Sequence, residues 1–124
     1  MSRVALSLAT VAFSVAVMAA DTAEAPESIS DESIAVMQAG AKRYDDCLQI
    51  WTTDYLSAYE DVRAVADAAM KRCDGPLKEL DAELAATGMP ESARAAHIAR
   101  IRDSLVGKLM PALVARKADA RPGD

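Results

Sequence analysis

The hydrophobic pattern of this chain has helical spacing over most of its length. Between residues 30 and 55, apolar side chains recur at alternating steps of three and four, as in a helix that buries one face. Ser28 or Ser30 can cap the start, and the acidic pair Asp31 and Glu32 favours the positive end of the helix dipole. The pattern predicts a helix over about residues 30–53. The apolar positions are Ile34, Met37, Ala41, Tyr44, Leu48, Trp51 and Tyr55.

The same apolar phase continues to residue 69, so one helix from residue 30 to residue 72 is an open alternative. Two local features favour a break. The segment Thr52-Thr53-Asp54 is poor helix-forming sequence. The segment from Ser57 to Glu60 has the form of a capping box. In this motif the Ser57 side chain accepts from the backbone N–H of Glu60, and the Glu60 side chain accepts from the backbone N–H of Ser57. A second helix is therefore predicted over about residues 57–73.

The chain has two cysteines, Cys47 and Cys73, and their pairing would exclude the single helix. Along one straight helix their Cα atoms would lie ~39 Å apart, whereas a disulfide requires ~7 Å or less. We therefore expect the chain to reverse between Asp54 and Glu60. The midpoint of the cysteines is residue 60, later than the capping signal indicates. A later turn, a sliding of one helix and an intermolecular disulfide all remain open.

Glycine and proline residues predict the boundaries of two further helices. Asp74-Gly75-Pro76 is expected to end the second helix and to open a third over about 76–87, which Thr87-Gly88 ends. Pro90 opens a fourth helix over about 90–117, and Pro111 within it is expected to kink the helix rather than stop it. No strand alternation or internal repeat is evident. The predicted fold is all-α, a small bundle of about four helices whose first two form a disulfide-linked hairpin.

Residues 1–20 have the form of a secretory signal peptide. Arg3 provides a positive start, the uncharged apolar run from Val4 to Val17 is too short to span a bilayer, and small residues follow at Ala19 and Ala20. An uncleaved anchor is the alternative. We expect a flexible arm at 21–29, a single helical domain at 30–117 and a frayed tail at 118–124. The predicted location is periplasmic or secreted, with no membrane association after cleavage.

The charge balance argues against binding to nucleic acid. The formal net charge is −5 and falls to about −6 without the leader, whereas phosphate recognition needs clustered basic residues. Residues 21–90 hold 15 acidic and 6 basic side chains, and residues 91–124 hold 4 acidic and 7 basic ones. The economical explanation is a basic last helix packed on an acidic body, although a partner could use the same asymmetry.

One group of residues suggests a partner surface. Three aromatic residues, Tyr44, Trp51 and Tyr55, fall on the apolar stripe and are expected in the core. Tyr59 lies outside the stripe near the predicted turn. A hairpin tip that exposes tyrosines beside carboxylates suits a protein interface. The predicted partner surface consists of Tyr55, Tyr59, Asp54, Glu60 and Asp61.

The sequence offers little for catalysis or cofactor binding. His97 is the only histidine, and no Cys-x-x-Cys-His, Glu-x-x-His pair, glycine-rich elbow or phosphate loop is present. The wide spacing of Cys47 and Cys73 favours a structural disulfide over a redox centre. We predict no metal, no cofactor and no enzymatic activity.

The leading hypothesis is an exported, non-enzymatic helical domain that acts by protein–protein contact, as an accessory subunit or client-binding factor. One alternative is a carrier of a small ligand or metal with its site between helices. Another is a thiol-based redox or stress sensor, which would need a labile disulfide. A homodimer is compatible with the same apolar stripe, which serves two chains as readily as one.

Overall fold

The computed structural model describes residues 29–120, which form four helices and no strand within that range. The helices are α1 (Asp31–Leu56), α2 (Val62–Arg72), α3 (Asp74–Ala86) and α4 (Glu91–Asp119). The all-α bundle and its disulfide-linked hairpin are confirmed. The predicted signal peptide, nearly all of the arm and residues 121–124 of the tail lie outside the described residues.

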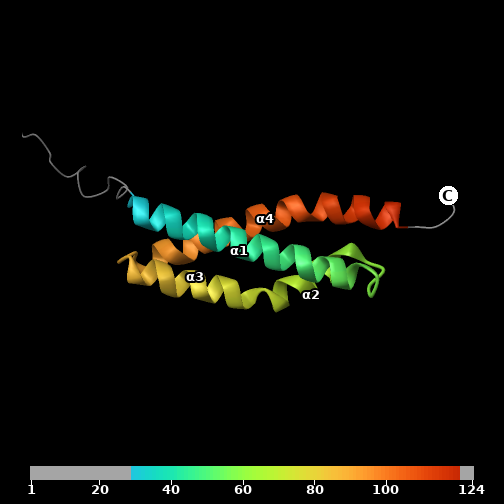
Figure 1. Cartoon of the computed structure of the whole chain (residues 1–124), viewed down its shortest axis with the longest axis horizontal. Coiled ribbons are helices and arrows are strands. Elements are labelled where there is room, and N and C mark those ends of the chain that lie inside the picture. Colours follow the sequence, from blue (N-terminus) through green and yellow to red (C-terminus); the bar gives the residue numbers. More distant parts are fainter. Residues whose placement is uncertain (1–28, 121–124) are drawn as a thin grey trace, which may run out of the picture.

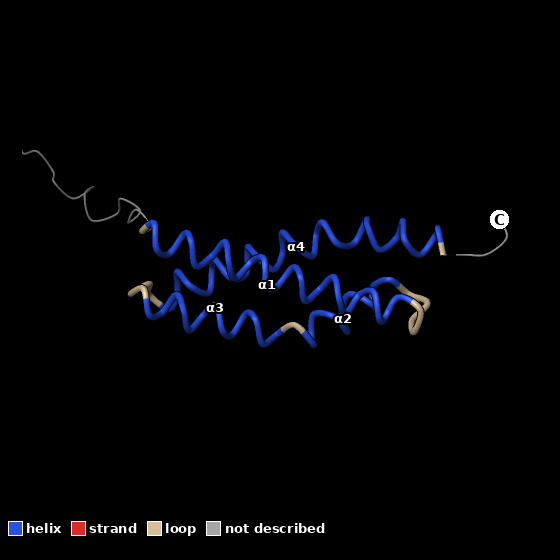
Figure 2. The backbone as a smooth tube through the Cα atoms, viewed as in Figure 1, coloured by secondary structure: helices blue, strands red, loops and turns tan. Residues whose placement is uncertain are grey.

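The four helices make three arms (Figure 1). α1 runs along the bundle, α2 and α3 return along it one after the other, and α4 runs back beside α1. The short interruption between α2 and α3 is visible in the backbone trace (Figure 2). The arms match in length, since α1 has 26 residues and spans about 39 Å, and the combined return arm is nearly as long.

The core lies where the three arms meet. Tyr44 and Leu48 of α1 pack with Val65 and Ala69 of α2, and α4 closes this cluster. Leu80 and Leu84 of α3 are also buried and extend the core beyond this cluster. The fully or almost fully buried leucines are Leu48, Leu80, Leu84, Leu109 and Leu113. The α3 and α4 leucines of this set therefore face inward.

The turn between the first two helices comes later than its capping signal indicated. α1 continues to Leu56, Ser57 is its C-terminal cap, and α2 begins at Val62 with Asp61 as its cap. The predicted capping box at Ser57 is therefore wrong. α1 continues through the poor helix-forming segment Thr52-Thr53-Asp54 because Thr52 is fully buried and its hydroxyl donates to Leu48 O at 2.6 Å. Tertiary packing therefore overrides the local helix propensity.

The boundary between the second and third helices also differs from the prediction. α2 ends at Arg72, and α3 begins at Asp74, so Asp74-Gly75-Pro76 forms the first turn of α3. Proline is tolerated there because the first N–H groups of a helix have no intrahelical acceptor. α4 continues through Pro111, as expected, and ends two residues beyond the predicted limit.

The buried face of α1 is shifted in its first half. Ser33 and Gly40 are buried, whereas Ile34, predicted on the apolar stripe, is 39% exposed. Gly40 allows Leu80 of α3 to approach the helix backbone. Ser33 donates to Thr87 Oγ1 at 2.8 Å, which satisfies its buried hydroxyl. The predicted stripe is therefore correct at Tyr44 and Leu48 and off by one residue nearer the start of α1.

Candidate functional site

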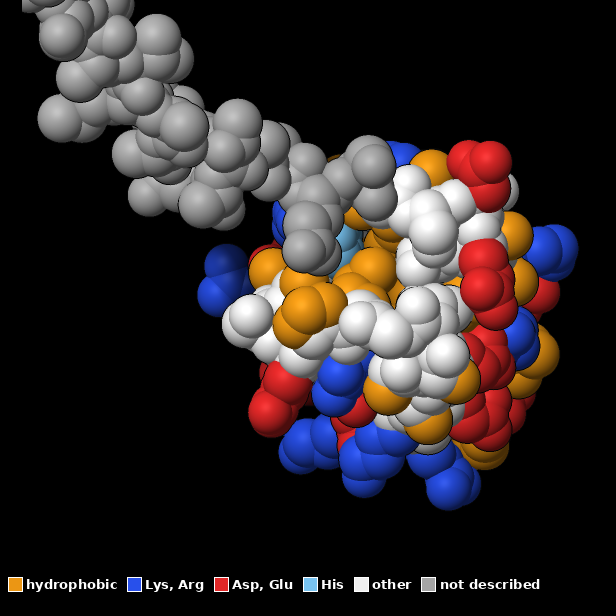
Figure 3. Space-filling view, turned by 90° about the vertical axis from the view of Figure 1, so that its left-hand side faces the viewer, with side chains coloured by type: hydrophobic (Ala, Val, Ile, Leu, Met, Phe, Trp, Pro, Cys, Tyr) orange, Lys and Arg blue, Asp and Glu red, His pale blue; other side chains and the backbone are white. Residues whose placement is uncertain are grey.

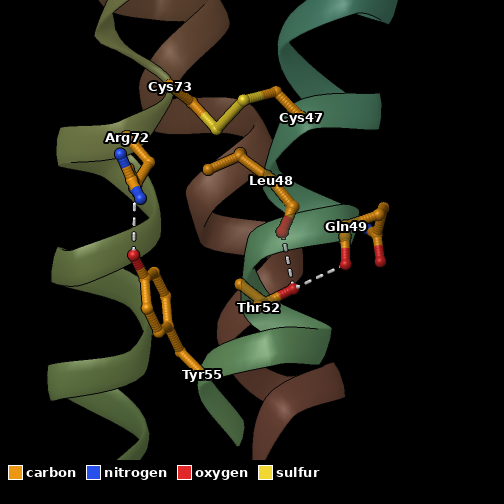
Figure 4. Close-up of a disulfide and its surroundings, with 7 residues drawn as sticks. All are labelled: Cys47, Leu48, Gln49, Thr52, Tyr55, Arg72 and Cys73. Atoms are coloured by element: carbon orange, nitrogen blue, oxygen red, sulfur yellow. Dashed lines mark hydrogen bonds between the residues drawn. A yellow bond between two sulfur atoms is a disulfide. The ribbon is translucent and has the colours of Figure 1, made fainter.

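The disulfide joins the middle of α1 to the junction of α2 and α3 (Figure 4). The Cα atoms of Cys47 and Cys73 lie 5.8 Å apart. Cys73 is fully buried and Cys47 partly so. The loop at residues 57–61 brackets the midpoint of the two cysteines, so the later turn, one of the three options left open above, is the correct one.

An aromatic ladder extends from α1 into the loop, made of Trp51, Tyr55 and Tyr59. Trp51 and Tyr55 stack with ring centroids 5.6 Å apart, and Tyr59 meets Tyr55 edge-on at 5.8 Å. The Arg72 guanidinium lies 4.3 Å over the Trp51 ring. Its Nε also donates to the Tyr55 hydroxyl at 3.1 Å (Figure 4). These contacts hold the first two rings against α2.

Lys117 of α4 fixes the position of the loop that carries Tyr59. Lys117 Nζ donates to the carbonyl oxygens of Leu56 and Tyr59, each at 2.8 Å. The Asp61 carboxylate accepts from Arg63 N at 3.0 Å and so caps α2. The ammonium group thus bonds one carbonyl that the end of α1 leaves free and one in the loop itself, which fixes the loop against α4.

The structure distributes the predicted partner residues over two grooves rather than one surface. Tyr55 and Tyr59 line a groove of about 440 Å³, here called the tyrosine groove, with α2 on its other side. Glu60 and Asp61 line a separate groove of about 300 Å³ that α4 closes with Val114 and Lys117. Asp54 is exposed and lines neither. The two grooves lie on either side of the loop.

The α2 side of the tyrosine groove was not anticipated from the sequence. Ala64 and Ala68 form its floor, and Asp67, Lys71 and Arg72 complete the lining. The alanines lie four residues apart, on a half-buried face of α2 beside the one that buries Val65 and Ala69. The sequence signal for this surface is the pair Ala64 and Ala68, which lies among charged residues of the same helix.

A third cleft lies at the opposite end of the bundle, between the start of α1 and the turn from α3 to α4. Its volume is about 410 Å³, and Ser33, Thr87, Met89 and His97 are among its lining residues. Figure 3 faces this end and shows apolar side chains next to the pale blue histidine side chain, which lines this cleft. His97 Nδ1 lies 3.3 Å from the Arg100 guanidinium.

Comparisons with protein-family models, curated proteins and solved structures found no match to this chain. The geometry is therefore the basis for assigning a role. Among residues 29–120, no group of three or more histidine, cysteine, aspartate or glutamate side chains is placed to hold a metal ion. Within the same range no helix is both long and apolar enough to cross a bilayer.

Proposed function

We propose that this protein is an exported, non-enzymatic helical domain that binds another protein through the tyrosine groove. The observation that carries the proposal is the exposure of Tyr59, which leaves 41% of its surface open although its backbone is bonded to α4 and its ring rests on Tyr55. Tyrosine is among the residue types enriched where protein interfaces concentrate their binding energy.

The groove has the composition of a recognition site for protein. Tyrosine provides apolar area and a hydroxyl with few rotatable bonds, so its ordering on binding costs little. The Ala64 and Ala68 floor leaves room for an incoming side chain or helix. Asp67 and Lys71 provide charges of both signs at the rim, which would fix the register of the partner.

Export is part of the proposal and rests on the sequence of residues 1–20. The Cys47–Cys73 disulfide supports it, because such bonds persist chiefly in oxidising compartments. The full burial of Cys73 weighs against a thiol-based sensor, since an attacking thiolate needs access to a sulfur.

A small-ligand carrier is the second candidate, and the cleft at the opposite end favours it. Its volume of about 410 Å³ lies within the range of small-molecule sites. Native mass spectrometry of untagged protein tests this candidate. A stoichiometric adduct that Ser33→Ala or His97→Ala removes would support it, and bare protein from its native host would oppose it.

The main proposal is tested by a photo-crosslinking residue at Ala64, on the groove floor, in the exported protein. We expect a specific protein adduct that Tyr59→Ala reduces about tenfold or more. Ile50→Ala is the matched control, because Ile50 is 63% exposed on α1 and lines no groove described above. A crosslinker at Ala82, exposed on α3, reports background. Equal adducts with and without Tyr59, or none at Ala64, would overturn the proposal.

A further inference from the structure

The outer face of the return arm carries charges of alternating sign. Arg63, Asp67 and Lys71 follow one another at steps of four along α2, and Asp74 opens α3 three residues later. All four side chains are exposed. They lie on the opposite side of the arm from Val65 and Ala69, which are fully buried. The order of charges along this face is therefore plus, minus, plus, minus.

The two central charges have no ion-pair partner within the described residues. Asp74 and Lys78, which have the same order and spacing, form an ion pair at 2.9 Å. Asp67 and Lys71 do not pair, and both line the tyrosine groove beside its alanine floor. The groove thus combines small apolar side chains with one free charge of each sign.

We propose that the partner in the tyrosine groove is the α2 helix of a second copy of this chain, antiparallel to the first. The inference rests on the proposed function of the groove and names its occupant. About a two-fold axis near the level of residue 69, Asp67 of each copy faces Lys71 of the other, and Arg63 faces Asp74, which also pairs with Lys78 of its own copy. A two-fold contact is self-complementary in this way, since each pair occurs twice.

The charge order selects the antiparallel arrangement. Asp67 and Lys71 lie about 3 Å on either side of the axis level, since the helix rises about 1.5 Å per residue. In a parallel pairing each charge would meet its own kind, which is repulsive. The Ala64 and Ala68 side chains are short enough to let two helix axes approach to about 8 Å.

Sedimentation equilibrium of the disulfide-intact exported protein tests this inference. We expect a reversible dimer whose dissociation constant rises with added salt, because exposed ion pairs are screened. Asp67→Lys or Lys71→Asp alone should raise the dissociation constant about tenfold or more, and the double reversal D67K/K71D should recover the wild-type value to within about threefold. The control reversal K42D/D46K changes an exposed ion pair on α1 and should have no effect.

The outcomes separate this inference from the proposed function. A protein that stays monomeric at millimolar concentration, or a dimer unchanged by the Asp67 and Lys71 reversals, overturns the second copy as occupant. If the Ala64 crosslinker then captures a different protein in a Tyr59-dependent manner, the groove remains a protein-binding site. If it captures nothing, the proposed function is overturned as well.

Discussion

Gly40 is the glycine, among those in the described residues, where an added methyl group would meet its neighbours most closely. It lies in the middle of α1, buried against α3. A Cβ atom there would lie 2.5 Å and 2.9 Å from the two Leu80 methyl carbons and 3.0 Å from Leu80 Cγ. Carbon atoms in contact prefer about 3.5–4.0 Å. The clash includes the branch point of Leu80, so rotation of its methyl groups does not relieve it.

Two opposing effects decide the size of the change in Gly40→Ala. Alanine stabilises a helix interior by about 1 kcal/mol relative to glycine. Overpacking of a tight core costs about 1–3 kcal/mol, and the upper end applies because Leu80 is fully buried and has no free space to move into. We expect a net loss of about 2 kcal/mol in the free energy of unfolding.

Gly107→Ala is the matched control. Gly107 also lies inside a helix, but a Cβ atom there would meet nothing within 4 Å. Only the higher helix propensity of alanine then applies, so the free energy of unfolding of this variant should rise by about 0.5–1 kcal/mol. Urea unfolding of the oxidised proteins, followed by circular dichroism, measures both. Equal signs for the two variants, or a Gly40→Ala protein as stable as wild type, would refute the reasoning.

Three further predictions test other contacts. Replacing both Cys47 and Cys73 with serine should lower the free energy of unfolding by about 3 kcal/mol, because the disulfide closes a loop across a sequence separation of 26 residues; urea unfolding measures this loss, and an unchanged midpoint would contradict it. Lys117→Met removes two charged hydrogen bonds to the loop, at a cost of about 1–3 kcal/mol, and should speed amide hydrogen exchange at Ala58 and Tyr59 but not at mid-α3. Burial raises the pKa of the Tyr44 phenol above its ordinary value of 10.0, although Arg102 opposes this; the folded state therefore holds that proton more tightly, and the associated stability is complete below pH 10 and is lost as the pH rises toward the folded pKa. Tyr44→Phe should flatten that alkaline loss in urea unfolding, and a slope identical to wild type would count against it.

The sequence predicts the hairpin because two independent constraints agree. The apolar stripe through Tyr44 and Leu48 gives the buried face of α1, and the cysteine spacing requires a reversal. The local signals at Thr52 and Ser57 predict a turn that is too early, whereas the cysteine midpoint indicates the observed loop. A buried side chain such as Thr52 gains more from packing than it loses in helix propensity, and burial is a tertiary property that a local pattern does not contain.

The first half of α1 shows a different limit. A rule that places large apolar residues inward selects Ile34, yet the helix buries Ser33 and Gly40. A straight helix drifts about 20° per heptad from a 3.5-residue repeat, so a stripe fixed at Tyr44 rotates by a fraction of a residue at each earlier turn. The compensating contacts, Leu80 on Gly40 and Thr87 on Ser33, come from α3 and its last turn. Neither is visible in the sequence of α1.

The candidate site shows the same dependence on tertiary packing. Tyr55 and Tyr59 stood out in the sequence as aromatic residues near a turn, but the surface they share is completed by α2 and not by the loop carboxylates. The later turn is the cause, since it lengthens α1 by about one turn beyond residue 53 and brings Tyr55 alongside Arg72. Glu60 and Asp61 then fall on the side facing α4.

The position of the disulfide follows from the same geometry and has a consequence for the return arm. Pro76 has no N–H to donate to the carbonyl of Arg72. The series of backbone hydrogen bonds that would join α2 and α3 into one helix is therefore interrupted at Cys73. Cys73 occupies that junction and is tied to α1 through its sulfur. The covalent link therefore secures the one point of the arm where helical bonding is weakest, and it holds α2 in the register that forms the tyrosine groove.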